Sequence, residues 1–373
     1  MASKLKKYFP IIREKEEVLA EIEKSRALQE KFDKWTEEQK EEFLNFCTGV
    51  KGLKLLYDGF FKEVMNPEYV PERLNDFLSQ ILCQKVRVLK VLPADSVRIA
   101  DESSLLIMDI VVEMEDGSIA NLEVQKIGYL FPGQRSACYS ADLLLRQYKR
   151  VRGEAEEKKK FSYRDIKNVY TIVLFEKSPK EFYDYPKECY HFFEQKSNTG
   201  LEIELLQKYL FIPLDIFREN KHNGDIKEKR DAWLTLFSND NPDVIIELIE
   251  EYPEFRQIYE EAYEICLNVE RVMDMFSKEL YELDKNTVQY MIDEQEQKIG
   301  EMQKTIDKQK REIDEIQKEH VKEMDGMQKQ AIRNAMKILR DLRLPEQEIR
   351  ARICKQYQIG DEQVREFFNQ ENN

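Results

Sequence analysis

The stretch Leu105–Lys126, which reads LLIMDIVVEMEDGSIANLEVQK, decides the fold and carries the main chemical signal of this 373-residue chain. Two runs rich in apolar and β-branched residues flank the tetrapeptide EDGS at residues 115–118, a pattern that predicts a β-hairpin. Asp109 lies on the first predicted strand, and Glu123 lies near the end of the second. The pairing of these two strands therefore determines which side chains share a face of the sheet.

Two registers of this hairpin are open to the sequence. A two-residue loop would put Asp109 opposite Val124 and send Glu123 to the other face. A three-residue loop, with Gly117 as a left-handed bulge, puts Asp109 opposite Glu123. We expect the second register, because it separates polar from apolar side chains and turns Lys126 away from the polar face. The polar face would hold Asp109, Val111, Glu113, Asn121, Glu123 and Gln125, and the apolar face Ile110, Val112, Met114, Ala120, Leu122 and Val124.

The predicted polar face has the chemistry of a metal site. Two carboxylates, Asp109 and Glu123, held about 5 Å apart on neighbouring strands repel each other unless a cation lies between them. Oxygen ligands favour Mg²⁺ or Mn²⁺, which can bind a phosphate oxygen and lower the pKa of an attacking water. The alternative is a solvent-facing hairpin with ordinary surface carboxylates.

The composition excludes several other classes of protein. A hydrophobic content of 42% with 35% charged residues is typical of a soluble protein with an extended helical part. No apolar run is long enough to span a membrane, and the N-terminus does not resemble a signal peptide. The six cysteines are scattered without a metal-binding spacing, which is typical of a cytoplasmic protein. None of His191, His222 and His320 lies near a nucleophile motif, so Ser-His-Asp or Cys-His catalysis is poorly supported.

The order of predicted elements indicates a mixed α/β sheet flanked by helices. Strands are expected at Val86–Leu92, at the hairpin, at Asn168–Phe175 near the centre of the sheet, and at Lys208–Leu214, with helices at Pro71–Leu82 and Gln134–Arg152. We expect residues 11–48 to form a helical hairpin or one long helix. The predicted domains are an N-terminal helical arm (1–50), the α/β domain (51–225), a helical extension (226–284), a coiled coil (285–330) and a helical tail (331–373).

The coiled coil is predicted from a heptad pattern. Ile299, Ile306 and Ile313 repeat every seven residues, and Met302, Gln309 and Ile316 follow each of them by three. This pattern predicts a homodimer, in which polar seam residues such as Gln309 and His320 would fix the register. The tail has helix-turn-helix spacing, which suggests a small packing module more strongly than a DNA reader.

Four further segments, in order, resemble one family. The order Asp109, then Glu123-Val124-Gln125, resembles the D…(D/E)-x-K signature of the PD-(D/E)XK nuclease superfamily. YDGFFK (57–62), LNDFL (74–78), QRSACY (134–139) and NVYTIVLF (168–175) are similar to segments of its Rpn-like branch of recombination-promoting nucleases and transposases. The resemblance covers roughly residues 55–285 and implies a restriction-endonuclease-like fold.

This resemblance assigns roles to residues. Asp109 and Glu123 would bind Mg²⁺ or Mn²⁺, with the main-chain carbonyl of Val124 as a third ligand. Gln125 stands where the superfamily usually has lysine; an amide carries no charge and cannot act as a base, so Gln125 could only orient the water. Glu72 matches the helix-borne acidic residue of the superfamily, although Asp76 competes with it, and an acidic residue at a helix start has a simpler explanation.

Basic residues are concentrated in the segment that follows the predicted metal site in the sequence. Residues 146–167 hold nine basic and four acidic side chains, a local net charge of +5 in a chain of −14. Such a patch can follow a phosphate backbone, although the charged segment 154–160 is also typical of a solvated loop. The predicted DNA contacts are Arg135, Arg146, Lys149, Arg150 and Arg152.

Two functions from different classes remain. The first is an Mg²⁺-dependent DNA endonuclease acting in recombination or transposition, which the polar face of the hairpin favours. The second is a catalytically inactive, nuclease-like scaffold protein that dimerises through its coiled coil. The acidic overall charge and the coiled coil favour this second function, and the lysine-to-glutamine departure at Gln125 leaves room for reduced or lost activity.

Overall fold

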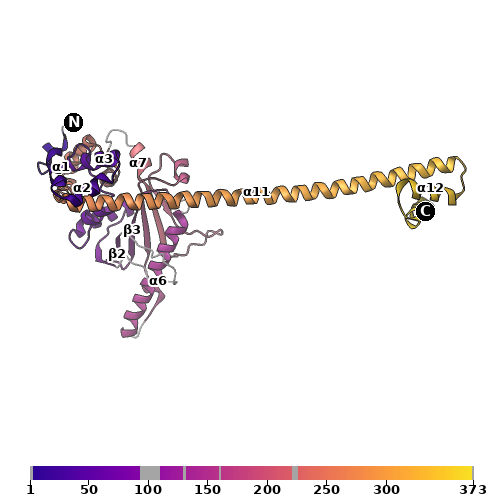
Figure 1. Cartoon of the computed structure of the whole chain (residues 1–373). Helices are drawn as coiled ribbons and strands as arrows, with labels where there is room; N and C mark the ends of the chain where they lie inside the picture. Colours follow the sequence, from indigo (N-terminus) through magenta and orange to yellow (C-terminus); the bar gives the residue numbers. More distant parts are fainter. Residues whose placement is uncertain (1–2, 93–109, 129–131, 159–160, 221–225, 372–373) are drawn as a thin grey trace. The chain divides into compact units, whose positions relative to one another are not determined.

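The computed structural model describes residues 3–92, 110–128, 132–158, 161–220 and 226–371. The chain divides into two compact units, Met1–Asp293 and Glu294–Asn373. The first unit is built on a mixed six-stranded sheet with the order β1-β2-β3-β4-β6-β5 (Figure 1). The strands are β1 (Val88–Val91), β2 (Ile110–Met114), β3 (Ile119–Gln125), β4 (Val169–Phe175), β5 (His191–Phe193) and β6 (Gln207–Pro213). Together with the helices around it, this sheet confirms the predicted α/β fold.

The direction of pairing changes across the sheet. The pairs β1–β2 and β2–β3 are antiparallel, β3, β4 and β6 run parallel, and β5 returns antiparallel to β6. β4 is central, and all seven of its side chains are buried, as its apolar β-branched sequence predicts. β5 was not predicted, because three residues are too few to show an alternating pattern.

The hairpin between β2 and β3 has the predicted register. Ile110 pairs with Leu122, and Val111 pairs with Asn121. The three-residue loop places Gly117 at a φ of +85°, in the region that favours glycine. Register and bulge are therefore both confirmed for the described part of the hairpin. Asp109 lies outside the described residues.

Two hydrogen bonds close the hairpin loop. The Gly117 N–H donates to the carbonyl of Met114 at 2.9 Å, and the Met114 N–H donates to the carbonyl of Ser118 at 2.8 Å. Asp116 Oδ1 accepts from the Ser118 N–H at 2.9 Å, an Asx-type contact that supports the turn. A side chain at Gly117 would also be crowded, since its Cβ would lie 3.2 Å from Cγ of Lys167.

The two faces of the hairpin are both buried, but under different elements. The apolar face joins the main hydrophobic core, to which α5 (Pro71–Leu82) contributes Leu74, Phe77 and Leu78. The other face lies under the long helix α6 (Pro132–Lys158), where Val111 and Ile119 pack with the helix residues Tyr139 and Leu143. The polar side chains of β3 therefore lie between the sheet and α6.

The remaining helices of the first unit enlarge the main core. The described helices are η1 (Leu5–Lys7), α1 (Lys15–Lys24), α2 (Arg26–Asp33), α3 (Glu37–Cys47), α4 (Asp58–Val64), η2 (Tyr163–Asp165), η3 (Lys180–Asp184), α7 (Leu214–Asn220), α8 (Lys229–Ser238), α9 (Pro242–Glu251) and α10 (Glu254–Ile265). The N-terminal segment forms three short helices instead of a hairpin or one long helix. Ser25 ends α1 and caps α2, and Thr36 caps α3 in a reciprocal capping box, so each break has a local cause.

Aromatic packing joins the N-terminal helices to the helical extension. Trp35 and Phe43 lie against Phe276, with ring centroids 4.9 Å and 5.7 Å apart. Arg73 in α5 forms a bidentate ion pair with Glu261 in α10, at 2.6 Å and 2.7 Å. The N-terminal arm, the sheet and the extension therefore share one core.

The second unit contains the end of α11 (Val269–Asp341) and two short helices, α12 (Glu346–Tyr357) and α13 (Asp361–Glu371). Ile332 and Met336 of α11 pack with Ile349, Ile353 and Val364 of the short helices. The predicted helical tail is thus a small packed module. None of the helices in the described part of the chain is long and apolar enough to cross a membrane.

The left-handed turn gives a test of stability. Gly117→Ala should lower the free energy of unfolding by about 1 kcal/mol, because alanine is strained at a positive φ. The measurement is urea denaturation of the full chain. Gly153→Ala is the matched control: it lies inside α6 with open space around it, so alanine should be neutral or stabilising. An unchanged midpoint for Gly117→Ala would contradict the proposed role of the turn.

Candidate active site

A row of polar side chains follows β3 on the face beneath α6. Asn121, Glu123 and Gln125 occupy alternate positions, so they point to the same side of the sheet. Their exposed fractions are 0%, 4% and 3%. The interpretation of Glu123 as an ordinary surface carboxylate is therefore wrong. A carboxylate buried to this degree needs hydrogen-bond donors or a cation to offset the loss of water.

The amide of Asn121 supplies one such donor. Its Nδ2 lies 3.1 Å from Oε1 of Glu123, and both groups are buried. This bond fixes the position of one oxygen of the carboxylate. The sequence predicts Asn121 on the polar face but does not predict this role. The only signal for the role is that Asn121 lies two residues before Glu123.

The side-chain amide of Gln125 is buried. Within the described part of the chain, neither Oε1 nor Nε2 of its amide has a hydrogen-bond partner. Leaving a buried polar group unpaired costs about 1–3 kcal/mol, so such groups are rare unless a ligand, ion or water satisfies them. The Glu123 carboxylate is the kind of oxygen ligand that Mg²⁺ or Mn²⁺ prefers, and the amide of Gln125 can hold a water molecule of such a hydrated ion.

α6 and the neighbouring strands extend this polar layer. Ser136 Oγ on α6 and Thr171 Oγ1 on β4 are also buried, and neither has a hydrogen-bond partner among the described residues. Ser140, one turn after Ser136, accepts a hydrogen bond from Gln207 Nε2 at 3.1 Å. Ser136, Ser140, Thr171 and Gln207 are not predicted as site residues from the sequence. The available signal is the spacing of Ser136 and Ser140 by four residues, which places both on one helix face.

Val124 and Asp109 are the other two predicted metal ligands. The main-chain carbonyl of Val124 belongs to β3, and Asp109 lies outside the described residues. Across the ranges that the structure describes, no three His, Cys, Asp or Glu side chains come together as a metal-binding group. Glu72 is exposed in the first turn of α5, a helix that packs on the apolar side of the sheet. The structure therefore does not bring Glu72 to the face that carries Glu123.

Asp76, the competitor of Glu72, has structural contacts. Its Oδ2 accepts a hydrogen bond from Trp233 Nε1 at 2.8 Å and lies 3.0 Å from Nζ of Lys229. These contacts connect α5 to α8.

The lysine that follows β3 points away from the polar row, as predicted. Nζ of Lys126 lies 2.9 Å from the carboxylate of Glu279, donates to the carbonyl of Leu56, and lies 5.1 Å from the ring centre of Tyr57. These contacts are on the side of the main core. Lys126 therefore does not replace the lysine that Gln125 lacks.

The basic residues of α6 divide into paired and exposed groups. Arg146 forms an ion pair with Asp142 at 2.7 Å, and Arg150 forms one with Glu113. Lys149 is exposed.

The other two predicted DNA contacts lie near aromatic rings on the same helix. Arg135 Nε donates to the Tyr139 hydroxyl at 2.8 Å, which confirms their shared helix face, and Arg152 donates to the Tyr148 hydroxyl at 2.6 Å. Both arginines are exposed, as is Lys149, so a phosphate backbone could reach these three side chains.

A mixed sheet flanked by helices, with a buried acidic and amide row at the end of a strand, defines a nuclease-like α/β protein. The family model described as PD-(D/E)XK nuclease family transposase matches residues 55–295. This match covers more than half of the chain, so the chain belongs to that family. The predicted family is confirmed. A search of curated proteins and a search of solved structures found no significant match.

The position of Lys126 predicts a structural role for this side chain. Lys126→Met should lower the free energy of unfolding by about 3–5 kcal/mol, because Glu279 would stay buried without its partner. The double variant Lys126→Met/Glu279→Gln should recover much of this loss, since the unpaired charge is removed. Urea denaturation of both variants measures the effect. A Lys126→Met protein of normal stability would contradict this role.

Proposed function

We propose that the chain is a divalent-metal-dependent DNA endonuclease that hydrolyses phosphodiester bonds in recombination or transposition. The observation that carries the proposal is the buried pair Glu123 and Gln125, with an amide that no described group satisfies. A structural protein gains nothing from such a pair, since apolar residues of similar size would stabilise the sheet more. Membership of the nuclease family supports the same reaction class.

In this proposal the residues divide the work. The carboxylates of Asp109 and Glu123 and the carbonyl of Val124 would hold Mg²⁺ or Mn²⁺. When bound, the metal would polarise the phosphodiester and supply a water of lowered pKa. Asn121 keeps the Glu123 carboxylate in position through the 3.1 Å hydrogen bond. Gln125 orients the attacking water, and its amide cannot accept the proton, so the proton must leave to solvent or to phosphate.

DNA would approach along α6. Arg135, Lys149 and Arg152 are exposed and offer positive charge to the backbone. Arg146 and Arg150 would act less directly, because their ion pairs with Asp142 and Glu113 already use part of their charge. The described residues form no disulfide between cysteines, which supports activity in the cytoplasm.

We also propose that two chains associate through α11. Ile299, Ile306, Ile313 and Ile316 are exposed on the helix, with Ile306 at 45%. A helix that exposes an apolar heptad stripe is typical of one strand of a coiled coil. This stripe also supports the second candidate function, an inactive scaffold protein, in which the coiled coil would be the functional part.

The catalytic proposal is tested by removing its ligands. Glu123→Gln and Asp109→Ala should each lower Mg²⁺-dependent nicking of supercoiled plasmid by more than about a hundredfold, because each removes a charged metal ligand. Mn²⁺ binding measured by calorimetry should weaken in parallel. Glu115→Gln is the matched control, since Glu115 is an exposed hairpin acid outside the polar row. If both variants nick normally, the assignment fails; if the wild type neither binds Mn²⁺ nor cuts DNA, the scaffold function is correct.

The association through α11 has its own test. Ile306→Asp should shift the full chain from dimer to monomer in light scattering, because a charge at the seam cannot be buried against its copy. Lys304→Asp, two residues earlier and off the seam, should leave the mass unchanged. A monomeric wild-type chain at micromolar concentration would overturn the dimer.

A further inference from the structure

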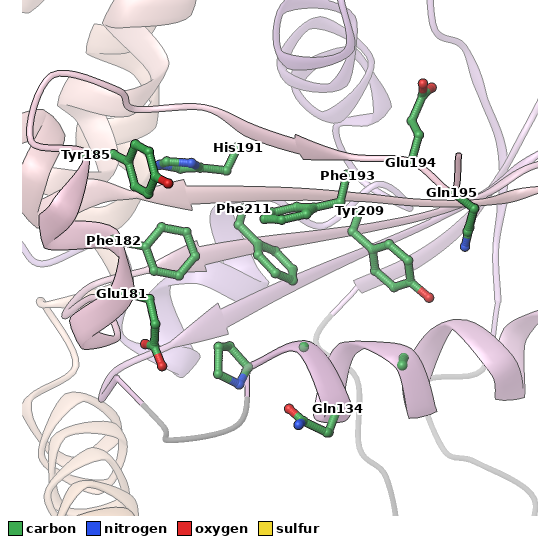
Figure 2. Close-up of a pocket in the computed structure, with 13 residues that line it drawn as sticks. Gln134, Glu181, Phe182, Tyr185, His191, Phe193, Glu194, Gln195, Tyr209 and Phe211 are labelled. Atoms are coloured by element: carbon green, nitrogen blue, oxygen red, sulfur yellow. The ribbon is translucent and has the colours of Figure 1, made fainter. Parts of the chain in front are cut away.

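A cavity of about 590 Å³ opens between the start of α6 and the strands β5 and β6. Five of its lining side chains are Phe or Tyr: Phe182 from η3, Tyr185 directly after η3, Phe193 from β5, and Tyr209 and Phe211 from β6. Figure 2 shows these rings gathered on the side of the strands that faces the helix carrying Gln134. The catalytic residues proposed above do not include any of them.

The aromatic rings of the cavity include both buried and exposed members. Phe182 and Phe211 are buried, and their ring centroids are 6.1 Å apart. Phe193 lies 5.2 Å from Phe211 but keeps 49% of its surface exposed, and Tyr185 is exposed as well. Large exposed aromatic side chains around a hollow are a common mark of a ligand site, because leaving them in water is unfavourable. They present flat faces on which a planar ring can stack.

The cavity lies on the same face of the sheet as the candidate active site. Glu123 is in register with Val173, and Val173 is in register with Phe211, across strands that run parallel. Residues in register on parallel strands point to the same face. Two strand spacings separate Glu123 from Phe211, a distance of about 10 Å. One DNA strand can therefore reach both places at once.

The charge around the cavity disfavours phosphate. Glu181 and Glu194 line it, and Glu194 is only partly neutralised by Lys208 at 3.6 Å. Burial lowers the pKa of His191, against a smaller opposing effect of Glu188, so this imidazole is neutral at neutral pH. The cavity therefore suits an uncharged planar group. His191 Nε2 has no hydrogen-bond partner within the described ranges, which offers such a group a polar contact.

We propose that this aromatic cavity binds an unstacked nucleobase of the DNA strand whose phosphodiester lies at Glu123. The inference rests on the proposed endonuclease function and names its substrate class. The base stacks on Phe193 and Phe211, while the phosphates stay outside the acidic lining, along the exposed cations of α6. Because a paired base must first leave the helix, DNA with an unpaired base at the cut site is the preferred substrate.

The test uses the full chain and a single-stranded DNA carrying 2-aminopurine, with EDTA present so that no cleavage occurs. Fluorescence anisotropy gives the Kd, and the 2-aminopurine emission reports whether the base is enclosed. Phe193→Ala should weaken binding roughly five- to a hundredfold, the range measured for loss of one base-stacking aromatic. Phe192→Ala is the matched control: it neighbours Phe193 on β5, is 50% exposed and is not among the residues that line the cavity. It should bind like the wild type.

The outcomes separate this inference from the endonuclease proposal. Binding that depends on Phe193 and persists in Glu123→Gln supports the cavity even if no cleavage is found with Mg²⁺. Equal Kd values for Phe193→Ala and the wild type overturn it, even if plasmid nicking is normal. The same holds if duplex and single-stranded DNA bind equally well and 2-aminopurine emission stays that of the free strand.

Discussion

The pairing of β2 with β3 is the constraint on which the site depends. Side chains alternate along a strand, so a slip of one residue would move Glu123 and Gln125 to the apolar face of the sheet. Gly117 opposes this slip, because its left-handed conformation completes the bulge of a three-residue loop, whereas a type I′ loop would also require Asp116 at a positive φ, which it does not adopt. One turn residue therefore determines both which side chains join the main core and which lie beneath α6.

The polar layer beneath α6 is costly for the fold. Gln125, Ser136 and Thr171 each bury polar atoms without a partner in the described part of the chain. At about 1–3 kcal/mol per unpaired group, the layer weakens a sheet whose opposite face is mainly apolar. Proteins accept such local costs chiefly where a ligand is to be bound. The large shared core, which extends from the N-terminal helices to α11, supplies the stability that this layer lacks.

The hairpin register, the central strand β4 and the family could be predicted from the sequence, because each depends on local patterns. Burial of the polar face could not be predicted, because nothing in the hairpin sequence indicates that α6 covers this face. Ser136 and Thr171 lie far from Glu123 in the sequence, and only the fold brings their elements together. β5 has three residues and no pattern of its own. The cavity beside it was therefore not predictable either.

The order of strands in the sheet has a consequence for how the protein folds during synthesis. Glu123 on β3 is in register with Val173 on β4, which in turn is in register with Phe211 on β6. Both of these neighbours are synthesised later than Glu123. Contacts so distant in sequence form slowly, because a long loop must close before they stabilise anything. A growing chain therefore carries β3 without its parallel neighbours until β4 and β6 have been made. The polar row of β3 can therefore take its final arrangement only in a chain whose sheet is complete.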